Sequence, residues 1–238
     1  NNLKTGEILP TEIKNTDGGS CWANDSKTLF YTKIDPQTLR SHKVYRYQVG
    51  QTSPKDVLVF HEKDETFNTG IFKSKSEQYL IIESDSTLST ESRFLDASTP
   101  EGAFKIFQPR QRGLEYDIAH YGEYFYVLNN ADGATNFKLD KTPITHTELE
   151  HWSEVLPHRE DTRLEEVDIF KEYLVVTERS QGLSQLRIIR WDGTKDMYLP
   201  FDNETYTAST GLNLDFDTHW LRYIYNSMTT PYSIIDYN

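Results

Sequence analysis

The stretch Gln78-Tyr79-Leu80-Ile81-Ile82 decides the fold, because an aromatic-rich strand of the same kind occurs five times along the 238 residues. The other copies are Thr28-Leu29-Phe30-Tyr31-Thr32, Glu123-Tyr124-Phe125-Tyr126-Val127, Glu172-Tyr173-Leu174-Val175-Val176 and His219-Trp220-Leu221-Arg222-Tyr223. The anchors Leu29, Tyr79, Tyr124, Tyr173 and Trp220 lie 50, 45, 49 and 47 residues apart. Self-similarity at this period, with several short strands per unit, is typical of β-propeller blades.

A second landmark keeps the same register, because the next predicted strand of four units ends in Asp before a turn. These residues are Asp96, Asp140, Asp192 and Asp236, which follow the anchors by 17, 16, 19 and 16 residues. We therefore predict an all-β fold: a β-propeller of four-stranded antiparallel blades, of which about five are present.

The repeat also sets the expected boundaries. The predicted blades cover residues 17–63, 64–112, 113–160 and 161–203, and an incomplete blade covers 204–238. Residues 1–16 are predicted to be the tail of a preceding blade, so the chain is expected to begin and end within a blade. One hypothesis is that Glu7 to Ile13 supplies the fourth strand of the last blade and closes a smaller ring.

Composition limits the classes of partner. The formal net charge of −12 disfavours nucleic acid, because phosphate contacts need clustered Lys and Arg. An acidic surface leaves room for cationic partners, although solubility alone also explains it. The single Cys21 cannot form an intramolecular disulfide, so we expect a cytoplasmic location and leave the periplasm open. No apolar run approaches the roughly 18 residues of a membrane span, so no membrane partner is expected.

Sequence patterns for catalysis and metal binding are missing. Gly18-Gly19-Ser20-Cys21-Trp22 is the nearest approach to a nucleophile elbow, but Trp22 stands where that turn requires Gly. His146, His151 and His158 lack the spacing or the Cys partners of a zinc site. We therefore expect no catalytic residue, no metal and no cofactor in this chain.

Carboxylates mark the segments that we predict as the first strands of three blades. They are Glu115, Asp117, Glu166, Asp168, Asp215 and Asp217. Because side chains alternate along a strand, the acids of each pair share one face and the apolar residues share the other. If the acidic faces line the central channel, they form a negative tunnel that concentrates cationic peptides. The alternative is that these acids are solvated or paired with Arg, and the sequence leaves both open.

Five motifs are more specific than the repeat. They are Phe60-His61-Glu62-Lys63-Asp64-Glu65-Thr66-Phe67, Thr90-Glu91-Ser92-Arg93-Phe94-Leu95-Asp96, Leu156-Pro157-His158-Arg159, Glu178-Arg179-Ser180-Gln181-Gly182-Leu183 and Leu221-Arg222-Tyr223-Ile224-Tyr225-Asn226-Ser227-Met228-Thr229-Thr230-Pro231. Together they closely resemble the N-terminal domain of the oligopeptidase B (protease II) group, in the prolyl oligopeptidase family of serine peptidases. The similarity extends over essentially the whole chain.

This resemblance implies a parent enzyme in which a seven-bladed propeller sits over an α/β-hydrolase domain and admits only short peptides, cleaved after Arg or Lys. The catalytic triad would belong to the hydrolase domain, expected after Asn238, so this chain alone is expected to be inactive. The implied partners are peptide substrates, preferentially basic, and the parent enzyme's own hydrolase domain. Two other interpretations are a stand-alone propeller acting as a protein-interaction scaffold and a hydrolase that acts by itself.

The resemblance also raises the question of which residues meet the hydrolase domain. Glu62, Asp64 and Glu65 lie on the predicted connection between the first two blades and are candidates for interdomain contacts. Asp64 could equally well hold the turn, and the sequence alone does not choose between the two roles.

Overall fold

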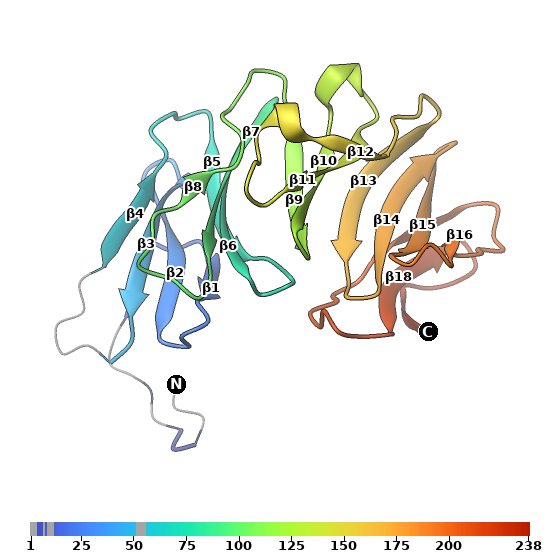
Figure 1. The fold of residues 1–238 in the computed structure, drawn as a ribbon. Helices are drawn as coiled ribbons and strands as arrows, with labels where there is room; N and C mark the ends of the chain where they lie inside the picture. Colours follow the sequence, from blue (N-terminus) through green and yellow to red (C-terminus); the bar gives the residue numbers. More distant parts are fainter. Residues whose placement is uncertain (1–3, 7, 9–11, 51–55) are drawn as a thin grey trace.

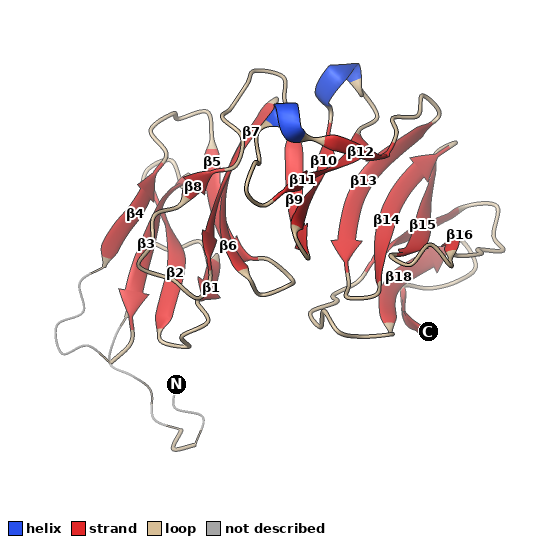
Figure 2. Ribbon diagram, in the orientation of Figure 1, coloured by secondary structure: helices blue, strands red, loops and turns tan. Residues whose placement is uncertain are grey.

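The computed structural model describes residues 4–6, 8, 12–50 and 56–238, and its regular structure is almost entirely β-strand (Figure 1 and Figure 2). Five sheets follow one another along the chain and together form an open arc (Figure 1). Within each sheet the strands lie in chain order and pair antiparallel. The predicted all-β propeller architecture is confirmed.

The bounds of the strands are as follows. The first sheet holds β1 (Ser20–Trp22), β2 (Thr28–Ile34), β3 (Ser41–Gln48) and β4 (Val57–His61), and the second holds β5 (Asn68–Lys73), β6 (Tyr79–Ser86), β7 (Ser89–Asp96) and β8 (Lys105–Ile106). The third holds β9 (Tyr116–Tyr121), β10 (Tyr124–Asn129), β11 (Lys138–Pro143) and β12 (Ser153–Leu156), and the fourth holds β13 (Thr162–Ile169), β14 (Tyr173–Ser180), β15 (Leu183–Arg190) and β16 (Asp196–Tyr198). The fifth holds β17 (Tyr206–Thr210), β18 (Leu221–Ser227) and β19 (Ser233–Tyr237), and two short 3-10 helices, η1 (Ala131–Gly133) and η2 (Leu149–His151), lie in loops.

The prediction that a strand of four units ends in Asp is only partly right. Asp96 does end its strand, but Asp140 lies inside β11, Asp236 lies inside β19 and Asp192 follows the end of β15. Residues 7 and 9–11 of the strand predicted over Glu7 to Ile13 lie outside the described residues, so that strand stays a prediction.

The recurring strand is apolar because it is covered on both faces by neighbouring sheets. In β6, Leu80 and Ile82 pack with Phe30 of the first sheet, whereas Ile81 packs with Phe125 of the third sheet. Successive side chains of a strand point to opposite faces, so consecutive residues contact different neighbours. Leu80, Ile81 and Ile82 are all fully buried, which explains why the stretch is continuously hydrophobic.

The same division repeats around the arc. In β10, Phe125 and Val127 face the second sheet, whereas Tyr126 and Leu128 face the fourth. The first strands of adjacent sheets also contact one another, as β1 does with β5 and β9 with β13. This places the first strands nearest the axis of the arc, where the predicted acids were expected to gather.

Candidate functional site

Three of the six predicted acids lie on the first strand of a sheet and a fourth directly precedes one, whereas their position in a central channel stays a prediction. Asp117 lies on β9 between two buried neighbours and is exposed, and Glu115 directly precedes that strand. Glu166 and Asp168 lie on β13, after a β-bulge at residues 164–166. The carboxylates of β9 and β13 are close enough for the charge of Glu166 to act on Asp117. The first strands of the third and fourth sheets therefore bring these acids together.

The prediction was wrong for Asp215 and Asp217, which lie in the loop after β17 and not on a first strand. Asp215 accepts a hydrogen bond from the backbone N–H of Asp217 at 3.0 Å, and Asp217 forms an ion pair with Lys171 at 2.6 Å. The backbone N–H of Lys171 also donates to the carbonyl of Phe216. The alternating acids of this segment therefore belong to a turn that docks on the fourth sheet, not to a strand.

Sequence reasoning missed two acids of the second sheet, Glu83 and Asp85, because they belong to a second strand, β6. Burial, together with the charges of Asp117 and Asp85, raises the pKa of Glu83 to about 7. The alternation of acids with Ser after the apolar run was the available signal. We call Glu83, Asp85, Glu115, Asp117 and Glu166 the axial acidic cluster.

The axial acidic cluster is poorly neutralised. Within the described part of the chain, the side chains of Glu83 and Asp117 form no hydrogen bond or ion pair, and the Asp85 carboxylate has only a backbone hydrogen bond from its own residue. Glu115 accepts one hydrogen bond from the Asn130 side chain at 3.2 Å, and Glu166 accepts one from Thr210 at 2.9 Å. Loss of hydration beside the strands, followed by the charges of Asp85, Glu115 and Glu166, raises the pKa of Asp117. Carboxylates without counter-ions leave a negative potential that favours cationic groups.

Asp168 is different, because a lysine from the second sheet reaches it. Lys75, in the turn between β5 and β6, places its ammonium nitrogen 2.6 Å from Oδ1 of Asp168. Burial lowers the pKa of Lys75, and the charges of Asp168 and Glu166 oppose that shift. The alternative that these acids are paired with a basic side chain thus holds for Asp168, although the partner is Lys and not Arg.

The same turn brings a serine and a histidine together. Ser76 Oγ lies 2.8 Å from Nδ1 of His120, which is buried on β9. The other ring nitrogen of His120 has no hydrogen-bond partner in the described structure, and its ring packs edge-on against Tyr79 and Phe125. A catalytic triad needs a third group that orients the base, so this contact is better described as a tether between sheets.

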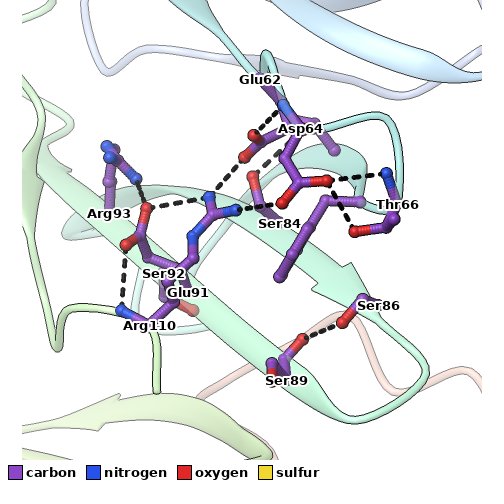
Figure 3. A network of polar contacts seen from close by, with 12 residues as sticks. Glu62, Asp64, Thr66, Ser84, Ser86, Ser89, Glu91, Ser92, Arg93 and Arg110 are labelled. Carbon is purple, nitrogen blue, oxygen red and sulfur yellow. Dashed lines mark hydrogen bonds and ion pairs between the residues drawn. The ribbon is translucent and has the colours of Figure 1, made fainter. Parts of the chain in front are cut away.

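The candidates for interdomain contacts lie at the junction of the first two sheets (Figure 3). Glu62 is buried and its Oε2 lies 2.5 Å from Nη2 of Arg110, which also contacts Glu91. Asp64 accepts hydrogen bonds from the backbone N–H and the hydroxyl of Thr66 at 3.0 and 2.7 Å, so it does hold the turn. Glu65 is exposed. An interdomain role for these residues stays a prediction.

Ser20 lies on the short strand β1, and its side chain forms no contact with a histidine in the described structure. The described residues contain no group of three or more His, Cys, Asp or Glu that is arranged to hold a metal ion. None of their helices is long and apolar enough to cross a membrane.

Fold and site together define a propeller-type domain with a cluster of acids on and beside the first strands of its sheets. Comparison with known proteins agrees: all of residues 1–238 match the family described as the prolyl oligopeptidase N-terminal β-propeller domain. The chain therefore belongs to that family of serine peptidase propellers, and the resemblance seen in its motifs is confirmed.

Individual relatives point the same way. The chain is 38% identical to the dipeptidyl aminopeptidase BI of Pseudoxanthomonas mexicana over 100% of its own length and 32% of the relative, and 29% identical to protease 2 of Moraxella lacunata over 96% and 33%. Its fold is similar to oligopeptidase B of Leishmania major, with a TM-score of 0.88, 27% identity and coverage of 97% of this chain and 34% of that one. The chain thus spans about a third of the length of these relatives.

Proposed function

We propose that this chain is the substrate-gating propeller of a serine peptidase that cleaves short peptides after Arg or Lys. Family membership supports the peptidase, and the axial acidic cluster supports the preference for basic peptides. In this proposal the triad comes from a hydrolase domain, and the propeller decides which peptides reach it.

The electrostatic part of the proposal follows from the unpaired carboxylates. The charges of Asp85 and Asp117 act on Glu83, and none of the three carboxylates has a basic partner in the described residues, so an Arg or Lys side chain that approaches them gains attraction. Attraction of this kind acts mainly on the rate of encounter, and it weakens as salt screens it. The propeller would thus raise kcat/KM for basic peptides without taking part in bond cleavage.

The test compares two short peptides that differ only by Arg or citrulline at the cleaved position, with the full-length protein. We expect the ratio of their kcat/KM values to be greater than one and to fall as salt increases. The double variant Glu83→Gln with Asp117→Asn should flatten this salt dependence, whereas Glu65→Gln, at an exposed site, should not. A double variant whose salt dependence equals that of the unmodified protein would contradict steering by the cluster.

The gating part has its own test. The same Arg-containing sequence is presented once as a free peptide and once within a stable folded protein, because a narrow opening admits the first and excludes the second. Equal cleavage of both would rule out size selection by the propeller.

A second candidate is a dipeptidyl aminopeptidase, favoured by the 38% identity to a relative of that name. An enzyme of that class removes dipeptides from a free N-terminus, whereas an endopeptidase tolerates a blocked one. Cleavage of a free peptide with no cleavage of its N-acetylated form would favour the aminopeptidase. Equal cleavage of both would favour the endopeptidase.

A further inference from the structure

Lys75 makes an unusual contact across the molecule. It leaves the turn between β5 and β6 in the second sheet and reaches past the third sheet to the fourth, where it meets Asp168 on β13. Its ammonium nitrogen lies 2.6 Å from Oδ1 of Asp168 and 3.3 Å from the ring centroid of Phe170. Only 17% of the Lys75 side chain and 18% of the Asp168 side chain are exposed, so this ion pair is largely shielded from water.

The groups around the ammonium resemble a binding site for a cation. Phe170 is fully buried and stacks on Tyr173, with 4.5 Å between ring centroids and 13° between ring planes. Tyr173 is 7% exposed, and its hydroxyl has no hydrogen-bond partner in the described structure. Burial and the charge of Asp168 raise the pKa of Tyr173, so this hydroxyl stays protonated. A carboxylate beside an aromatic face is a combination that recognises ammonium groups.

The frame of this site does not depend on Lys75. Asp168 is held in the ladder of β13, and Phe170, directly after that strand, is held by the hydrogen bond from its backbone N–H to the carbonyl of Tyr173. The turn that carries Lys75 has anchors of its own: Ser76 contacts His120, and the carbonyl of Glu77 accepts a hydrogen bond from the Asn24 side chain. Rotation of the Lys75 side chain alone would therefore vacate the site without breaking a strand ladder.

We propose that Asp168 and Phe170 form a binding site for a primary ammonium group of a peptide, and that Lys75 occupies this site until such a group displaces it. The ammonium group is that of a Lys side chain or of a free N-terminus. The physiological role of the site rests on the proposed function, because it requires peptides to reach the axis. Its ability to bind amines is independent of peptide cleavage.

The experiment measures the affinity of n-butylammonium, which reproduces the end of a Lys side chain, for the full-length protein by calorimetry. The variant Lys75→Ala should bind at least about tenfold more tightly than the unmodified protein, because the internal competitor is gone. Adding Asp168→Asn should abolish this gain. The matched control is Lys138→Ala, which removes a lysine of similar exposure that pairs with Asp132 and Asp140. It should leave the affinity unchanged.

Two further ligands separate the sources of the ammonium group. N-acetyl-lysine amide presents only the side-chain amine, and alanine amide presents only the α-amine. The compound that binds with the higher affinity identifies the natural ligand class. n-Butanol, which has no charge, should bind none of the variants measurably. Equal n-butylammonium affinities for Lys75→Ala and for Lys75→Ala with Asp168→Asn would overturn the proposal.

A second variant tests the ammonium site if Lys75→Ala does not fold. In that case, Lys75→Ser also removes the competing charge and leaves the place of the ammonium over Phe170 open. n-Butylammonium should then raise its melting temperature more than an equal concentration of sodium chloride does, and an equal effect of the two salts would also overturn the proposal. Amine binding without Arg-directed cleavage would contradict only the proposed function. Arg-directed cleavage without amine binding would contradict only the ammonium site.

Discussion

Individual charged side chains explain why four of the five motifs are so specific. Glu62 and Glu91 come from two of these motifs and meet on Arg110 at the junction of the first and second sheets (Figure 3). Glu178 comes from a third motif, is fully buried, and pairs with Arg159 of a fourth at 2.5 Å. A buried ion is stabilised only when its partner is in place, so these residues have few alternatives. These four motifs therefore supply ion pairs that hold the fold together, not a catalytic centre.

Glu83 gives a prediction about pH. Its pKa is about 7 in the folded protein against an ordinary value of 4.5, so the folded state holds a proton that the unfolded state releases over that interval. The contribution of Glu83 to stability should therefore be greatest below pH 4.5 and should be lost as the pH rises through about 7. Glu83→Gln should remove this loss and raise the free energy of unfolding by about 1 to 3 kcal/mol near pH ~8.

Urea unfolding at a series of pH values measures this effect. The difference between Glu83→Gln and the unmodified protein should vanish at acid pH, where Glu83 is protonated in both states. Glu65→Gln serves as the control, because Glu65 is exposed and should change the curve little at any pH. A Glu83→Gln variant that is less stable than the unmodified protein at alkaline pH would contradict the raised pKa.

Among the strands, β6 shows how one element joins two interfaces. Leu80 packs toward the first sheet and Ile81 toward the third, and both are fully buried. Replacing either with Ala should cost about 2 to 5 kcal/mol of unfolding free energy, through lost burial and the cavity that remains. The two variants should nevertheless loosen different neighbours.

Hydrogen exchange distinguishes the two interfaces. Leu80→Ala should speed exchange mainly in β2 and β3, and Ile81→Ala mainly in β9 and β10, because local openings follow the packing that is lost. Leu88→Ala, at a side chain that is 54% exposed, should change neither region. Identical exchange patterns for Leu80→Ala and Ile81→Ala would show that the sheets do not behave as separate neighbours.

Over the whole molecule, the sequence was most informative where one physical cause repeats. The anchor strands β6, β10 and β14 each contain a continuous run of buried apolar residues, so their period was visible without a structure. The site was less predictable, because its residues meet through three dimensions. Glu83 comes from a second strand, and Lys75 pairs with Asp168, which lies 93 positions away in the sequence. The acids around Asp215 alternate with apolar residues as they would in a strand, although they lie in a loop. Alternation of polar and apolar residues predicts which side chains share a face if a strand forms, but it does not show that a strand forms.

The largest prediction concerns the 238-residue chain by itself, which should neither hydrolyse an Arg-containing chromogenic peptide nor react with a serine-directed fluorophosphonate. Ser20 contacts no histidine in the described structure, and the base beside Ser76 lacks a third group to orient it. A serine without an activated base is a weak nucleophile. Mass spectrometry of the treated chain, with a known serine hydrolase in the same tube as positive control, measures this directly. Labelling at Ser20 would show that β1 carries a nucleophilic serine, and labelling at Ser76 would show that Ser76 and His120 act as a catalytic pair. Either result would contradict the prediction.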